Sequence, residues 1–156
     1  AIATNSEELG SAGKYLTTTA KKPHSWEYYH DQLGYNFRMP NINAALACAQ
    51  LEQLDGFVEN KRQLAASYQS FFTSIGVTFK TEPENSKANY WLMAVELADR
   101  KERDAFLELT NKQGIMTRPI WTLMNKLPMY AHCQHDGLQN AQFLEDRIVN
   151  IPSSVR

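Results

Sequence analysis

The sequence predicts an α+β fold with a small, mostly antiparallel sheet. Three observations support this fold class: a long central segment with helical apolar spacing, three short runs rich in β-branched and aromatic residues after it, and capped helical segments between those runs. The 156 residues, 43% hydrophobic and 21% charged, are enough for a globular core. The expected order after the long helix is strand, strand, helix, strand, helix.

The first 39 residues combine a strand, a helix and a long loop in this interpretation. The opening "AIATN" is typical of a short strand, and Ser6 followed by Glu7 and Glu8 predicts a capped helix that ends near Leu16. Residues 17–40 are rich in threonine and aromatic side chains, too polar for a core element and too aromatic for a flexible linker. Irregular segments of this length inside compact domains are usually functional.

A long helix is predicted from Pro40, a residue suited to a first turn, to Gly76, which suits the position after a helix. Gly56 is expected to bend or weaken it midway. The apolar positions are Ile42, Ala45, Leu46, Ala49, Leu54, Phe57, Val58, Leu64, Tyr68, Phe71, Phe72 and Ile75. Because its first half carries almost no charge, we expect contacts on nearly all sides there, as at a subunit or domain interface.

The remaining segments supply the sheet and two helices. "VTFK" and "NYWLMAVEL" predict strands, the second of them central, and "IMTRPIW" predicts a strand at an edge because Pro119 lacks a backbone N–H. Asp99 and Gly114 delimit a helix between the second and third strands. The run "LQNAQFLEDRIVNIP" is interpreted as a last helix before Pro152.

The composition argues against several classes of partner. Sixteen basic and seventeen acidic residues give a net charge of -1 without a long like-charge run, so neither nucleic acid nor an anionic membrane surface is an expected partner. No transmembrane span or signal segment is recognised, which favours the cytoplasm. The group His132, Cys133 and His135 lacks a second ligand pair, so no metal site is expected.

A self-contained catalytic motif is absent from the sequence. No GxSxG, HExxH, P-loop or GxGxxG pattern occurs, and the polar candidates are Asn36, Arg38 and Arg118. The residues alone leave two interpretations of Asn36 open, a turn stabiliser and a ligand donor. They also leave open a free-standing, non-catalytic α+β domain that acts through protein–protein contacts.

The segment "HDQLGYNFRMPNINAALACAQLEQL" resembles the DegT/DnrJ/EryC1/StrS family of pyridoxal-phosphate-dependent sugar aminotransferases. "KQGIMTRPIW", "LPMY" and "NAQFLEDRIVNIP" resemble later segments of that family in the same order. The resemblance implies the C-terminal portion of a fold-type I enzyme. Residues 1–39 would end the large cofactor domain and form an active-site loop, and residues 40–156 would form the long interface helix and the small domain.

The same resemblance implies an activity. The subgroup it is closest to transfers an amino group, expected from glutamate, to C4 of UDP-linked 4-keto-6-deoxy sugars for surface polysaccharide biosynthesis, with pyridoxal 5'-phosphate as cofactor and a homodimer as the working form. The lysine that forms the Schiff base would precede Ala1, so residues 1–156 alone are expected to be inactive. Lys14, Lys21 and Lys22 lack its context and are expected to be solvated.

Six site residues follow from the resemblance. Asn36 would donate across the dimer to the phosphate of the partner's cofactor, since an amide offers two donors without burying another full charge. Arg38 would pair with the substrate diphosphate or fix the loop against helix carbonyls. His30, hydrogen-bonded to Asp31, would face a sugar hydroxyl or the diphosphate. The residues expected at the substrate entrance are Arg118, Trp121 and Tyr130.

Overall fold

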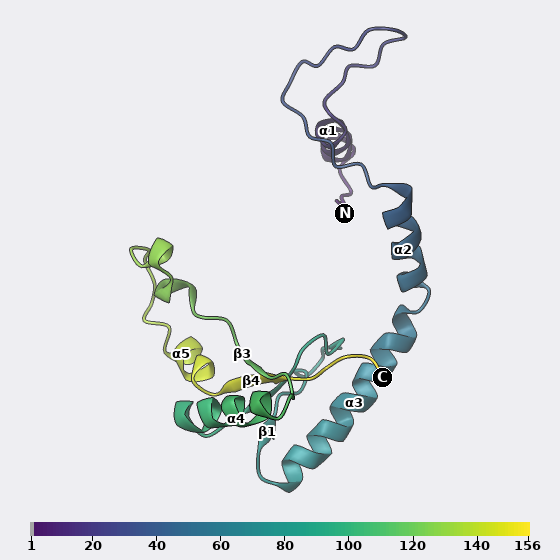
Figure 1. The fold of residues 1–156 in the computed structure, drawn as a ribbon. Coiled ribbons are helices and arrows are strands. Elements are labelled where there is room, and N and C mark those ends of the chain that lie inside the picture. The colour runs from purple at the N-terminus through teal and green to yellow at the C-terminus, as the bar shows by residue number, and fades with distance from the viewer. Residues whose placement is uncertain (1) are drawn as a thin grey trace. The chain divides into compact units, whose positions relative to one another are not determined.

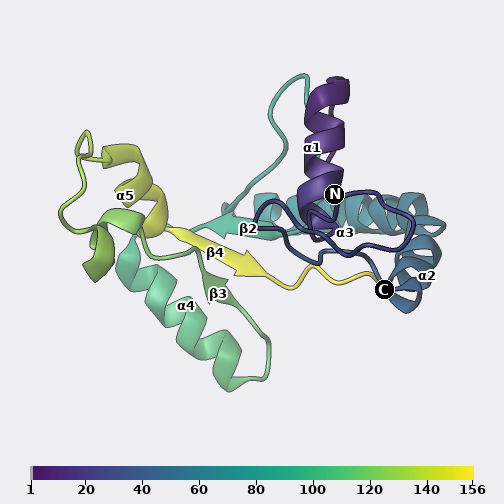
Figure 2. The same ribbon diagram turned by 90° about the horizontal axis from the view of Figure 1, so that it is seen from above.

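A computed structural model describes residues 2–156 (Figures 1 and 2). The chain folds into two compact units, one ending at Glu52 and one beginning at Gln53. The α+β prediction is confirmed, because the helices are combined with a four-stranded antiparallel sheet. No helix among the described residues has the length and apolar character that crossing a bilayer would require. The assignment of residues 1–39 and 40–156 to separate domains stays a prediction.

Unit 1 begins with helix α1, Glu7–Thr17, as predicted. The Ser6 side chain accepts a hydrogen bond from the Leu9 N–H and so caps the helix. The predicted opening strand is wrong for residues 2–5, which form no strand, and Ala1 lies outside the described residues. A strand needs a neighbour for its backbone groups, and no described segment pairs with these residues.

The loop after α1 is folded back on itself. Isolated antiparallel bridges join Thr18 to Asn36 and Lys21 to His30. The Phe37 N–H donates to the Thr17 carbonyl at 2.9 Å, so the returning arm is fastened to the last turn of α1. The aromatic, polar stretch is therefore an ordered loop, which agrees with the prediction that it is no flexible linker.

The tightest point of this loop is the contact between Gly34 and the Thr19–Ala20 backbone. Thr19 and Ala20 both have positive φ, 76° and 50°, which costs non-glycine residues free energy. Ala20 is fully buried. A Cβ at position 34 would lie 2.5 Å from the Thr19 carbonyl carbon and 2.6 Å from the Ala20 nitrogen. Only glycine allows the two arms to approach so closely.

The predicted single helix is two helices, α2, Asn41–Leu51, and α3, Leu54–Ser74. The turn falls at Glu52 and Gln53 rather than at Gly56, which lies in the first turn of α3. None of the residues of α2 is buried within the described residues. Gly76, at φ 76°, follows the end of α3 as predicted.

Unit 2 contains the sheet, with strands β1, Thr78–Phe79, β2, Met93–Glu96, β3, Arg118–Pro119, and β4, Ile148–Ile151. Their order is β1-β2-β4-β3, and every pair is antiparallel. The central place of β2 and the edge place of β3 are confirmed. Helix α4, Arg100–Lys112, is capped by Asp99, which accepts from the Glu102 N–H, and Gly114 follows it at φ 78°.

The last predicted helix is wrong in its second half. Helix α5, Gln139–Glu145, is followed by β4, a central strand that pairs with both β2 and β3. Three of the four residues of β4 are β-branched and buried, as fits a strand between two neighbours. Two short 3₁₀ helices, η1, Met124–Lys126, and η2, Pro128–Tyr130, lie between β3 and α5.

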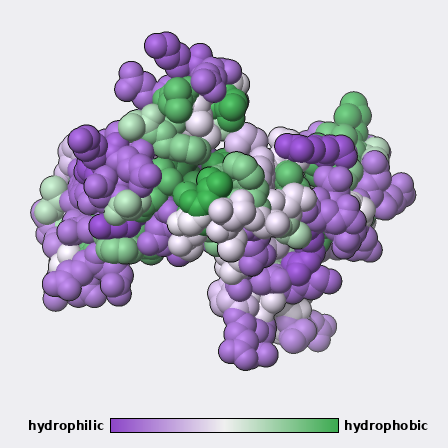
Figure 3. Space-filling model, turned by 90° about the horizontal axis from the view of Figure 1, so that it is seen from below, coloured by the Kyte–Doolittle hydropathy of each residue, from purple (hydrophilic) through white to green (hydrophobic). Residues whose placement is uncertain are grey.

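The core of unit 2 lies between the sheet and α3. Val95 and Val149 face each other in the β2–β4 register and are fully buried, and Ala65 and Phe72 of α3 belong to the same cluster. The alternate positions, Ala94 and Asn150, face away from this cluster. Other apolar side chains remain exposed, and Figure 3 shows such residues in green on the surface in view.

An ion pair fixes the loop between β1 and β2. The Arg62 guanidinium of α3 makes two hydrogen bonds to the Glu82 carboxylate, at 2.9 and 2.7 Å. The same carboxylate accepts from the Ala88 N–H, and Arg62 donates to the Ala88 carbonyl. The Arg62 bonds and the Ala88 N–H lower the pKa of Glu82 from 4.5 to about 2.

Replacement of Gly34 by alanine is expected to open the loop of unit 1. Its Cβ would overlap backbone atoms, which cannot move aside as a flexible side chain can, and overpacking of this kind costs about 1–3 kcal/mol. Amide hydrogen exchange at Thr19 and Tyr35 should accelerate. The matched control is Gly56→Ala, whose Cβ meets nothing within 4 Å. Unchanged exchange in Gly34→Ala would show that the close approach is not required.

Acid should weaken the Arg62–Glu82 contact. Because the folded-state pKa of Glu82 lies below its ordinary value, the stabilisation is complete above pH 4.5 and is lost as the pH falls toward 2. Urea unfolding of the wild type and of Glu82→Gln should therefore differ above pH 4.5 and converge in acid. A difference that is constant over this range would contradict the assignment.

Candidate functional site

The pocket with the most distinctive chemistry lies in unit 2, beside the edge strand β3 and the end of β4. It encloses about 550 Å³. Two predicted substrate residues, Arg118 and Trp121, line it. The other lining residues are Trp91, Leu92, Met116, Pro119, Asn150, Ile151, Pro152, Ser153 and Ser154. We call this the β3–β4 pocket.

The sheet register places the polar groups of the β3–β4 pocket. Arg118 on β3 is directly opposite Asn150 on β4, and Asn150 is opposite Ala94 on β2. All three therefore lie on the sheet face opposite the Val95–Val149 core. The register that buries the valines brings the guanidinium and the amide to the pocket.

Arg118 retains its capacity to bind an anion. Its side chain has one described contact, a hydrogen bond to the Met116 sulfur at 3.4 Å, and no carboxylate of residues 2–156 forms an ion pair with it. A guanidinium presents donors in a planar fork that matches phosphate and carboxylate oxygens. The arrangement suits an anionic group of a ligand.

Two tryptophans add flat apolar surface to the pocket. Trp91 and Trp121 are 68% and 72% exposed, which is high for the largest side chain. The Trp91 carbonyl accepts from the Ser153 hydroxyl at 2.9 Å, and Lys61 of α3 donates to the Ser153 carbonyl. The backbone at Trp91 and the segment after β4 are thereby tied to α3.

Trp91 and Asn150 are site residues that the sequence interpretation missed. The sequence interpretation places Trp91 in a strand and Asn150 in a helix, so it connects neither residue with Arg118. The β3–β4 pairing in the structure shows the connection, because Asn150 lies opposite Arg118 in its register. Tyr130, the third residue expected at the entrance, lies in η2 and does not line this pocket.

In unit 1, Asn36 and Arg38 are adjacent in the folded loop. The Arg38 guanidinium donates to the Asn36 side-chain oxygen at 3.3 Å and to the Thr18 carbonyl at 3.0 Å. Thr18 caps the end of α1, where free carbonyls attract cations. The structure thus gives Arg38 the loop-fixing arrangement, and contact between Arg38 and substrate stays a prediction.

The Asn36 amide is oriented by this contact. Its oxygen accepts from Arg38, and among the described residues its Nδ2 group has no hydrogen-bond acceptor. Both N–H donors are thus available at an exposed site. This donor set fits a phosphate group, which offers only acceptors when ionised.

His30 and Asp31 do not form the expected pair in this structure. The Nδ1 atom of His30 lies 2.7 Å from the Thr19 carbonyl, so Nδ1 carries the proton and Nε2 is left for another partner. Asp31 instead bonds to the Tyr15 hydroxyl and to Lys22, whose nitrogen is 2.8 Å away. These contacts connect the loop to α1.

The charges in this cluster stabilise one another. The hydrogen bonds from Lys22 and then from Tyr15 lower the pKa of Asp31, and the bond to Asp31 raises the pKa of Lys22. A lysine that attacks a carbonyl must lose its proton easily. Lys22 was expected to be solvated, but it forms an ion pair with Asp31, and its raised pKa does not fit a lysine that attacks a carbonyl.

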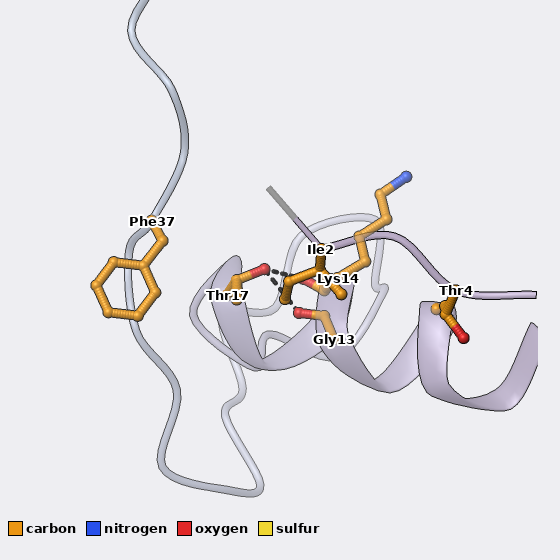
Figure 4. Close-up of a pocket in the computed structure, with 7 residues that line it drawn as sticks. Ile2, Thr4, Gly13, Lys14, Thr17 and Phe37 are labelled. Atoms are coloured by element: carbon orange, nitrogen blue, oxygen red, sulfur yellow. Dashed lines mark hydrogen bonds between the residues drawn. The ribbon is translucent and has the colours of Figure 1, made fainter. Parts of the chain in front are cut away.

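A second hollow, of about 430 Å³, lies along α1 in unit 1. Figure 4 shows Ile2 and Phe37 beside the helix turn that carries Gly13 and Thr17, whose hydroxyl donates to the Gly13 carbonyl. Lys14 is the one ionisable side chain among the described residues that line this hollow. The described residues contain no group of three or more His, Cys, Asp or Glu side chains able to hold a metal ion.

Known structures show which proteins share this fold, and known sequences show the family of the chain. The aminotransferase TlmJ from Streptoalloteichus hindustanus superimposes with a TM-score of 0.87 over 97% of the chain and 41% of its own length, at 19% identity. The sequence profile of the DegT/DnrJ/EryC1/StrS aminotransferase family matches residues 1–156. The chain belongs to this family. Its aminotransferases depend on pyridoxal 5'-phosphate.

Two relatives show which enzymes are similar. A GDP-perosamine synthase from Escherichia coli O157:H7 is 34% identical over 127 residues, which are 81% of this chain and 34% of that protein. A dTDP-4-amino-4,6-dideoxy-D-glucose transaminase from Escherichia coli is 26% identical over 126 residues, 76% of the chain and 34% of the protein. The chain thus spans about a third of the length of these relatives.

Proposed function

We propose that residues 1–156 form part of a pyridoxal-phosphate-dependent aminotransferase that transfers an amino group, taken from glutamate, to C4 of a nucleotide-linked 4-keto-6-deoxy sugar. Family membership over residues 1–156 supports the aminotransferase chemistry. Two relatives are named after nucleotide-linked sugars: one is a dTDP-4-amino-4,6-dideoxy-D-glucose transaminase and the other a GDP-perosamine synthase. The β3–β4 pocket is the observation that carries the substrate assignment, because it is lined by Trp91, Trp121 and Arg118, and Arg118 has no ion-pair partner within residues 2–156.

The cofactor, when bound, serves as the electron sink for the exchange of the amino group. In this proposal Asn36 holds its phosphate, because the Arg38 contact leaves both amide N–H donors of Asn36 free. The phosphate that accepts these hydrogen bonds would belong to the cofactor of a second subunit. The catalytic lysine is assigned to a part of the enzyme outside these residues, so the chain alone should not transaminate.

Five residues supply the proposed substrate contacts. Arg118 would bind the diphosphate, and Trp121 would cover the base or sugar from one side, since indoles offer large flat surfaces. His30 would use its free Nε2 toward a sugar hydroxyl or the diphosphate. Tyr130 and Arg38 complete the proposed substrate contacts, Tyr130 from η2 and Arg38 from the loop.

The partner in this proposal is a second copy of the same protein. Ile42 and Leu46, one turn apart on α2, are 83% and 63% exposed. Large aliphatic side chains on a helix without charge in its first turns favour burial against another surface. A homodimer would cover this face and bring Asn36 to the neighbouring cofactor.

The nucleotide is the least constrained part of the substrate. The resemblance of the loop favours UDP, whereas the relatives named above carry GDP and dTDP in their names. The competing idea of a free-standing interaction domain has no comparable support, because the family profile matches residues 1–156.

The direct test is product analysis with the intact protein. Purified enzyme is incubated with glutamate and, separately, the UDP-, GDP- and dTDP-linked 4-keto-6-deoxy sugars, and the product is identified by NMR. An amino group at C4 of one of these sugars is expected. The control is that the same preparation takes up the amino group of glutamate. If such a preparation converts none of the three sugars, the substrate assignment is overturned.

Asn36→Ala should weaken cofactor binding in the intact enzyme and should act on the other subunit. Loss of a hydrogen bond to a charged group should reduce cofactor affinity roughly ten- to a hundredfold. Because Asn36 is exposed on the loop, the fold should survive, which circular dichroism checks.

Mixed dimers test the crossing directly. When one subunit carries Asn36→Ala and the other lacks the catalytic lysine, the one working site is served by an intact Asn36 and should keep near-normal affinity. When both changes are on one subunit, the working site should be weakened. Equal affinity in the two arrangements would favour the turn-stabilising role of Asn36.

A further inference from the structure

Glu145 is a buried carboxylate that no part of the proposed function uses. It is the last residue of α5 and only 7% exposed. Its Oε1 accepts from the Leu123 N–H at 3.1 Å, and its Oε2 pairs with the Lys126 ammonium. Leu123 and Lys126 are the cap and the last residue of η1. One carboxylate therefore holds both ends of this short helix.

The backbone of Glu145 is fixed as well. Arg103 of α4, also 7% exposed, donates from its guanidinium to the backbone carbonyl of Glu145. Carbonyls at the end of a helix lack intrahelical partners, so a cation there satisfies and stabilises them. The contacts form a continuous series from α4 through the end of α5 to η1.

The electrostatics favour an ionised Glu145. Burial by itself raises the pKa of this carboxyl, but the Lys126 hydrogen bond and the Leu123 N–H outweigh it, and the pKa lies below its ordinary value. Removal of the Lys126 ammonium would leave the buried Glu145 carboxylate without a counter-charge. Within η1, the buried Asn125 Oδ1 atom has no hydrogen-bond partner among the described residues, so this side-chain oxygen does not help to anchor the segment.

Trp121, two residues before Leu123, depends on this anchor for its position. Within residues 2–156 its side chain makes no hydrogen bond, ring contact or cation–π contact. Its place in the β3–β4 pocket therefore depends on the backbone that carries it. That backbone is fixed on one side by β3 and on the other by the Glu145 contacts.

We propose that Glu145 is a positioning residue: through Leu123 and Lys126 it sets the place of Trp121 in the β3–β4 pocket and so the affinity for the nucleotide sugar. The inference rests on the proposed function for the identity of the ligand. The geometric part, that Glu145 positions Trp121, stands on the contacts alone.

Two variants of the intact protein separate this role from general stability. Glu145→Gln keeps the size of the side chain and an acceptor for the Leu123 N–H but removes the charge that pairs with Lys126. Lys126→Met removes the cation and leaves the carboxylate. The matched control is Glu108→Gln, the same chemical change at an exposed position of α4.

The first readout needs no activity. Acrylamide quenching of tryptophan fluorescence is measured for each variant, with Trp121 present and in a Trp121→Phe background. We expect Glu145→Gln and Lys126→Met to change the quenching only when Trp121 is present, and Glu108→Gln to change nothing. An equal change in the Trp121→Phe background would overturn the proposal. Lys126→Met keeps this decision available should Glu145→Gln fail to fold.

The second readout is kinetic. Loss of one charge-assisted contact should raise KM for the nucleotide sugar roughly tenfold in both variants, while the half-reaction with glutamate keeps its rate. Unchanged KM in variants whose Trp121 quenching has changed would overturn the link to substrate affinity. A wild type that aminates no nucleotide sugar would instead contradict the proposed function, and the quenching comparison would still decide the role of Glu145.

Discussion

The pairing of β2 with β4 is the constraint on which the rest of unit 2 depends. Val95 and Val149 are opposite each other and fully buried against α3, so the register has one arrangement that fills the core. Because side chains alternate along a strand, a shift by one residue would bury Asn150 and expose Val149. The β2–β4 register places Asn150 on the face away from the core, and the β3–β4 register places Arg118 opposite it at the pocket.

The pocket is built from segments that leave the sheet, and each is attached to a helix by a charged side chain. Lys61 of α3 holds the segment after β4 and, through Ser153, the backbone of Trp91. Glu145 at the end of α5 holds η1, which follows Trp121. The sheet thus positions the polar groups, and the contacts of two charged side chains, Lys61 and Glu145, position the aromatic walls. A rigid support of this kind lets exposed side chains keep a defined place for a ligand.

Local sequence signals predicted the helix boundaries well, because caps act over one turn. Ser6, Asp99, Gly76 and Gly114 all have the expected roles, and Pro119 lies on an edge strand. Long-range pairing was less accessible. Leu144, Ile148 and Ile151 have helical spacing although the last two belong to a strand, and only pairing with β2 and β3 decides the difference. The turn between α2 and α3 carries neither glycine nor proline, and both of its residues keep dihedrals near the helical region.

The most direct measurement is amide hydrogen exchange of the intact protein with and without the nucleotide sugar of the proposed reaction. If the sheet register brings Arg118, Asn150 and the two tryptophans to one ligand, exchange should slow in three separate peptides, 89–93, 116–122 and 150–154, and should stay the same in α4, residues 100–112. Slower exchange at a site elsewhere, with these three peptides unchanged at saturating ligand, would contradict the account.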